Sequence, residues 1–170
     1  MNASDSPAAT VSVRIVGFDP RWRGDFARLN LEWLRRWFVV EPFDEEVLGD
    51  PEKHILDGGG RILFALLEEA GAAPRAVGTV ALRNDGDGVY ELTKMAVEPG
   101  LRGLGIGRAL LDAAIEAYLG LGGRELYLES SSRLEPAIRL YERAGFAHRP
   151  APRPGTHYAR ADVHMVWEGR

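Results

Sequence analysis

Between Met95 and Leu111 the chain reads MAVEPGLRGLGIGRALL, with glycines at positions 100, 103, 105 and 107. This glycine-rich stretch stands between an apolar, strand-like run and a helical pattern. A turn from a strand into a helix needs one or two glycines, and each further glycine costs about 0.5–1 kcal/mol of ordering entropy. Glycine amides can approach an anion closely, and a helix N-terminus carries partial positive charge. The stretch therefore predicts an anion-binding loop, with a simple strand-to-helix turn as the alternative.

Two familiar phosphate-binding motifs do not fit this stretch. A phosphate loop ends in Gly-Lys-Ser/Thr, whereas Gly105 is followed by Ile106 and Gly107 by Arg108. A dinucleotide-binding fingerprint that starts at Gly105 needs its third glycine where Leu110 stands. The sequence thus argues against a nucleotide-binding regulatory domain.

The elements around the stretch predict a mixed α/β fold. The predicted strands are at 11–16, 61–69, 75–84, 88–97, 124–130 and 161–169, and the predicted helices are at 20–37, within 41–56 with a break at Gly49 or Pro51, at 106–121 and at 134–145. The turn sequences AGAAP and DGDG separate three of the strands and predict an antiparallel meander. A meander followed by a strand–helix–strand unit forms one mixed α/β domain, expected over 11–170, with a disordered tail at 1–10.

Composition excludes several classes of protein. The 170 residues are 45% hydrophobic and 27% charged, which is typical of a soluble globular domain. A net charge of −4 argues against a nucleic-acid partner. The absence of cysteine excludes disulfides and a cysteine nucleophile, and the four histidines lack metal-ligand spacing, so no metal is expected. No stretch resembles a signal peptide or a membrane span, and a cytoplasmic location without membrane contact is expected.

Two motifs resemble those of one family. Arg102-Gly103-Leu104-Gly105-Ile106-Gly107 is similar to the Gln/Arg-x-x-Gly-x-Gly/Ala signature of the GNAT superfamily of acyltransferases. The run AIRLYERAGF, residues 137–146, resembles the family's second motif, Ala-x-x-x-Tyr-x-x-x-Gly-Phe. The resemblance implies a GNAT fold with two splayed central strands, acetyl-CoA as co-substrate, and acetyl transfer by direct attack of an amine. It is also compatible with a homodimer.

The same resemblance implies where acetyl-CoA binds. The implied contacts are Met95, Ala96, Val97, Arg102, Gly103, Leu104, Gly105, Ile106, Gly107 and Arg108. In the family the pantetheine arm pairs with the backbone of the strand that ends at Val97, and the glycine-loop amides hold the pyrophosphate. Arg102 and Arg108 would add charge-assisted hydrogen bonds. The alternative for both arginines is a solvated helix start.

Acetyl transfer needs a base for the amine and an acid for the leaving thiolate. Tyr141 occupies the position of the family's tyrosine and is the predicted acid; the alternative is a core tyrosine. Glu91 stands among apolar neighbours in a central strand and is the predicted base. Strand alternation predicts that Lys94 lies on the opposite face from Glu91 and Met95, although pairing of Glu91 with Lys94 or with an arginine stays open.

The segments expected to form the acceptor site show the weakest sequence pattern. In the family the first two helices and the loop before the last strand wall the acceptor pocket, which implies Trp33, Phe38, Tyr158 and Arg160 here. The family's usual asparagine is replaced by Leu134, and the alternatives are that Ser131 or Ser132 takes its role or that the contact is lost. We expect a small-molecule amine as acceptor. A non-catalytic acyl-CoA-binding or sensing module is the alternative.

Overall fold

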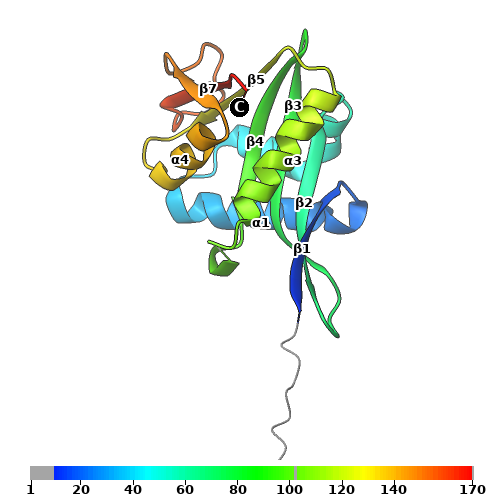
Figure 1. Cartoon of the computed structure of the whole chain (residues 1–170). Coiled ribbons are helices and arrows are strands. Elements are labelled where there is room, and N and C mark those ends of the chain that lie inside the picture. Colours follow the sequence, from blue (N-terminus) through cyan, green and yellow to red (C-terminus); the bar gives the residue numbers. More distant parts are fainter. Residues whose placement is uncertain (1–9, 102, 170) are drawn as a thin grey trace, which may run out of the picture.

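The computed structural model describes residues 10–101 and 103–169, and Figure 1 shows their arrangement. The strands are β1 (Val11–Gly17), β2 (Arg61–Glu69), β3 (Arg75–Gly86), β4 (Val89–Val97), β5 (Glu125–Ser130), β6 (Phe146–Arg149) and β7 (Val163–Trp167). The helices are α1 (Arg23–Trp37), α2 (Pro42–Gly49), α3 (Ile106–Gly120) and α4 (Glu135–Arg143), with short helical turns η1 (Pro20–Trp22), η2 (Glu52–Leu56) and η3 (Pro99–Leu101). Of the predicted tail, residues 1–9 lie outside the described residues.

One seven-stranded sheet has the order β1-β2-β3-β4-β5-β7-β6. Strands β1 to β4 are antiparallel, β4 and β5 are parallel, and β7 is antiparallel to both β5 and β6. The predicted meander and strand–helix–strand unit are therefore confirmed. Strand β6 was not predicted because its four residues are too few to show an alternating pattern.

Helices cover both faces of the sheet (Figure 1). The buried side chains of β2 alternate between two clusters: Ala65 and Leu67 pack in the cluster that contains Leu110 of α3, whereas Phe64 and Leu66 pack in the cluster of α1 and α2. This alternation follows from the two-residue period of a strand. Within the described residues, no helix combines the length and the apolar character needed to cross a bilayer.

The two central strands separate after a short parallel contact. Strand β4 pairs with β5 only from Val89 to Glu91. Beyond Glu91, the edge of β4 that faces β5 has no strand partner among the described residues, while its other edge stays paired with β3. The strands splay as the family resemblance implies, and the gap between them opens toward the start of α3 (Figure 1).

The predicted alternation along β4 is wrong after Thr93. The register with β3 shifts between the pairs at Thr93 and Ala96, and Lys94 has φ 53°. Such a bulge adds one residue to the strand and reverses the faces of the residues that follow. Lys94 therefore reaches α2 on the same face as Glu91, whereas Met95 packs in the cluster under α3.

Candidate active site

A cleft of about 700 Å³ occupies the space where β4 and β5 diverge. Its walls come from α1, β4, the start of α3, β5, α4 and the segment before β7. The predicted residues that line it are Trp33, Phe38, Glu91, Met95, Ala96, Val97, Gly103, Gly105, Ile106, Gly107, Arg108, Tyr141, Tyr158 and Arg160. Leu104 is instead 64% exposed, and Arg102 lies outside the described residues. The tertiary structure thus brings together nearly all of the candidates in one cavity.

The glycine loop gives the cleft a main-chain binding surface. Gly103 and Gly105 have φ values of 83° and 76°, a region that favours glycine. Helix α3 starts directly afterwards at Ile106, with no acidic residue in its first turn. Gly105 has no side chain that could cap the helix, so the first amides of α3 are left to bind an anion.

The unpaired edge of β4 adjoins this loop. Gly107 lies close to side chains of β4 and α4, since a Cβ atom there would come within 3.6 Å of the Leu140 side chain and 3.9 Å of the Met95 side chain. Main-chain groups of Met95 to Val97 can pair with an extended amide-bearing chain as a further strand would. The loop and this edge together fit the pyrophosphate and the pantetheine arm of coenzyme A. Arg108 lines the same end and forms an ion pair of 3.0 Å with Asp112.

Tyr141 lies on α4 and lines the cleft. Its ring packs edge-on against Phe146, with centroids 6.1 Å apart. Burial raises the pKa of Tyr141 to about 12, so the hydroxyl stays protonated at neutral pH. No hydrogen bond joins it to another described residue, which leaves the O–H group able to donate to a bound molecule.

Glu91 is buried and only 2% exposed. A guanidinium nitrogen of Arg83 lies 2.7 Å from its Oε2, an ion pair without the alignment of a hydrogen bond. Burial raises the pKa of Glu91 to about 7; Arg83 opposes the rise, whereas Asp85 and Glu129 add to it. Of the two partners that the sequence left open, the structure therefore pairs Glu91 with an arginine. The pKa of the Glu91 carboxyl group nevertheless lies near neutral pH, because burial outweighs the charge of Arg83.

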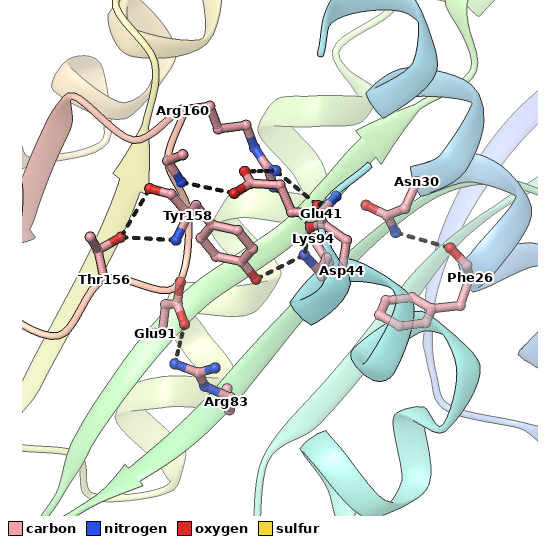
Figure 2. A network of polar contacts seen from close by, with 11 residues as sticks. Phe26, Asn30, Glu41, Asp44, Arg83, Glu91, Lys94, Thr156, Tyr158 and Arg160 are labelled. Carbon is pink, nitrogen blue, oxygen red and sulfur yellow. Dashed lines mark hydrogen bonds and ion pairs between the residues drawn. The ribbon is translucent and has the colours of Figure 1, made fainter. Parts of the chain in front are cut away.

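Asp44 and Lys94 form the centre of a polar network at the other end of the cleft (Figure 2). The Lys94 Nζ atom lies 2.6 Å from Asp44 Oδ1 and 2.9 Å from the Tyr158 hydroxyl. Arg160 donates two hydrogen bonds of 2.8 Å to Asp44 and one of 2.8 Å to Glu41. The network ties β4, α2 and the segment before β7 into one wall of the cleft.

The cations of this network keep Asp44 ionised, whereas burial lowers the pKa of Lys94. Burial alone would raise the pKa of Asp44, but the hydrogen bonds from Arg160 and the charge of Lys94 outweigh burial and lower that pKa to about 2. Asp44 and Lys94 were missed from the sequence. Asp44 also accepts a 2.9 Å bond from the backbone N–H of Glu41 in a capping box, which the sequence EPFD could have indicated. Its ionic partners are 50 and 116 positions away, so no local pattern reveals them.

The serines considered as replacements for the family's asparagine differ in their contacts. Ser131 is buried and lines the cleft, and its Oγ accepts a 3.3 Å hydrogen bond from the Arg133 backbone. Ser132 is exposed, and its hydroxyl donates to Asp162 at 2.6 Å. Leu134 also lines the cleft. Of the two serines, Ser131 is the one placed to contact a molecule in the cavity.

The chain matches known acetyltransferases in sequence. The Acetyltransferase (GNAT) family profile matches residues 27–146. The uncharacterised N-acetyltransferase YjgM of Escherichia coli (strain K12) is 31% identical over 105 residues, 62% of this chain and 63% of that protein. Mycothiol acetyltransferase of Propionibacterium freudenreichii is 37% identical over 87 residues, 50% of this chain and 27% of that protein. The chain thus spans less than two thirds of either relative.

Solved acetyltransferases share the fold. A GNAT-family acetyltransferase of Staphylococcus aureus Mu50 superposes with a TM-score of 0.80 at 20% identity, covering 92% of this chain and 98% of that one. The PaiA N-acetyltransferase of Thermoplasma acidophilum, solved with coenzyme A, gives a TM-score of 0.66 at 18% identity, with coverages of 92% and 98%. Since the family profile spans most of the chain and the sheet and helices agree, this protein belongs to the GNAT family of acetyltransferases.

Proposed function

We propose that this protein, as a single domain over 11–170, is an acetyl-CoA-dependent N-acetyltransferase that modifies the amine of a small molecule by direct attack. One observation carries the proposal. A single cleft joins a main-chain anion site, an unpaired strand edge, a buried carboxylate with a raised pKa and a buried phenol. The coenzyme A complex of the Thermoplasma acidophilum neighbour supports the choice of donor.

The cofactor-binding residues follow from the contacts available in the cleft. Backbone amides at Gly103 to Gly107 would hold the pyrophosphate, and Arg108 would add a charge-assisted hydrogen bond. The backbone of Met95 to Val97 would pair with the amides of the pantetheine arm. Acetyl-CoA supplies a thioester carbonyl that an amine can attack.

Glu91 and Tyr141 would move the protons. Glu91, directly or through a water, would take the proton that the acceptor nitrogen loses as its bond to the acetyl carbon forms. Tyr141 would donate its hydroxyl proton to the leaving sulfur and recover a proton from solvent. Since burial raises the pKa of Glu91 to about 7, the base is half ionised near neutral pH.

A thermal-shift experiment tests donor binding. Acetyl-CoA at about 100 times its Kd should stabilise the protein by about 2.7 kcal/mol. For a chain of this size, that gain raises the midpoint of unfolding by roughly 5–10 °C. NADH, at the same concentration, should leave the midpoint unchanged. No shift with acetyl-CoA would contradict the proposal.

A thiol-release assay separates catalysis from binding alone. Acetyl-CoA is incubated with the protein and a panel of amino acids, polyamines and aminoglycosides, and free coenzyme A is measured. Release that depends on an amine supports the enzyme. A thermal shift without release for any amine would instead identify a non-catalytic acyl-CoA-binding module.

A further inference from the structure

Two carboxyl groups line the same cleft, Glu91 and Glu129. Glu129 lies on β5, and its charge adds to the raised pKa of Glu91. The Glu129 Oε1 atom is buried, with no hydrogen-bond partner among the described residues. A buried carboxylate oxygen without a donor is costly unless a bound molecule supplies one. An ammonium group satisfies both carboxylates, as expected for the reacting end of an amine.

The outer end of the cleft is positively charged. A second hollow adjoins the cleft, and four arginines line it: Arg35, Arg36, Arg133 and Arg160. Its one acidic lining residue, among those described, is Glu41, which already binds Arg160 and the Ala159 backbone. No ion pair joins Arg35, Arg36 or Arg133 to another described residue. Because the whole chain has a net charge of −4, this local excess of positive charge is not a general property of its surface.

Arg133 is shared by the cleft and the second hollow. It lines both the cleft and the outer hollow, and its guanidinium lies 5.3 Å from the centre of the Phe38 ring. Trp33 packs against Phe38 at 5.7 Å between ring centroids, and both rings line the cleft. The cleft is therefore lined by two carboxylates, two aromatic rings and, in Arg133, a guanidinium without an ionic partner among the described residues.

Building on the proposed function, we propose that the acceptor carries an anionic oxygen group, a carboxylate or a phosphate, in addition to its reacting amine. The amine faces Glu91 and Glu129, the body lies along Trp33 and Phe38, and the anionic group binds Arg133. A guanidinium binds such groups through two parallel hydrogen bonds. A polyamine would place a second cation among the arginines and bind less well.

Matched acceptors test this assignment. The compounds carry the amine and the anionic group at opposite ends: 4-(aminomethyl)phenylacetate, its amide, 4-methylbenzylamine and 4-(aminomethyl)benzylphosphonate, with the 6-aminohexanoate and 8-aminooctanoate series as replicates. Thiol release gives kcat/KM at pH 8. We expect at least a tenfold higher kcat/KM for the anionic member of a series than for its amide and its decarboxylated amine. Most of the difference should come from a lower KM of the anionic acceptor. The kcat/KM of the carboxylate divided by that of the phosphonate identifies which anion the site prefers.

Variants tie the preference to Arg133. Arg133→Gln should bring the kcat/KM of the anionic acceptor down to that of the amide, and Arg133→Lys should restore part of the difference. Arg21→Gln is the matched control, since Arg21 lies in η1 with its own partner Asp19 and lines neither cavity. This variant should keep the full preference.

The outcomes separate this inference from the proposed function. The inference is wrong if the acceptors without an anionic group show the same kcat/KM as the anionic acceptors in all three series. It is also wrong if the preference survives in Arg133→Gln. In both cases the proposed acetyltransferase function stands. If acetyl-CoA causes no thermal shift and no amine releases thiol, both are wrong.

Discussion

The two ends of the cleft are built in different ways. The proposed cofactor end consists of main-chain groups from two stretches that lie close together in the sequence, Met95 to Val97 and Gly103 to Gly107. The proposed acceptor end is lined by side chains from α1, β4 and the segment before β7, held by the buried network of Asp44 and Lys94. Binding by main-chain groups at the cofactor end depends on local φ values. The structure of the acceptor end depends instead on the buried charges of Asp44 and Lys94. The two ends should therefore respond differently to substitution.

Asp44→Asn should have the largest effect on stability. Asp44 is fully buried between Lys94 and Arg160, and its neutralisation leaves the buried Lys94 without its carboxylate partner, while Arg160 keeps Glu41. Removing one partner of a buried ion pair costs about 3–5 kcal/mol, which urea denaturation would measure as a lower free energy of unfolding. Glu68→Gln, which breaks the exposed pair with Arg14, should cost less than about 1 kcal/mol. Equal losses would show that the network is no stronger than a surface pair.

Glu91→Gln should lower kcat about 10²–10³-fold if Glu91 is the base. The wild-type rate should fall as the pH drops below about 7, because the carboxylate is then protonated. The variant should lack this limb of the pH profile. A variant that keeps the limb would assign it to another group.

The same substitution gives an independent test in the stability of the protein. Burial raises the pKa of Glu91 from 4.5 to about 7, so the folded state holds a proton that the unfolded state has lost between these values. Stability from this group therefore falls as the pH rises through that window. Relative to wild type, the free energy of unfolding of Glu91→Gln should rise between pH 4.5 and 7, as measured by urea denaturation.

Tyr141→Phe should lower kcat about 10²-fold and leave the Kd of acetyl-CoA within about twofold. The ring packing on Phe146 is kept, and the hydroxyl has no hydrogen bond to a described residue that the change would break. Tyr118→Phe is the control, since Tyr118 packs on Tyr90 and Trp167 outside the cleft. An unchanged kcat in Tyr141→Phe would assign Tyr141 to the core.

Gly105→Ala should have the smallest effect and tests the cofactor end. An added Cβ would meet no atom within 4 Å, but φ 76° costs an alanine about 1–2 kcal/mol. We expect roughly a tenfold higher Kd for acetyl-CoA, measured by calorimetry, as the loop leaves its binding conformation. Gly100→Ala lacks both the positive φ and any close neighbour and should bind normally. Matching affinities for the two variants would show that the loop conformation does not control binding.

Sequence reasoning succeeded where the pattern was local. The strands of the meander, the start of α3 and the glycine loop each show their own periodicity or turn residues within about ten positions. It failed on β4, where two-residue alternation does not account for the bulge in the pairing with β3. It also missed β6, which is a strand because β7 pairs with it.

By itself, the sequence determined the order of the elements and the loop that starts α3, because hydrophobic period and glycine content act on neighbouring residues. Only the tertiary structure decided that Lys94 shares a face with Glu91, that Asp44 is enclosed between Lys94 and Arg160, and that Arg133 lines the cleft. These choices depend on burial and on charges that meet across distant segments. Neither is encoded in the spacing of adjacent residues.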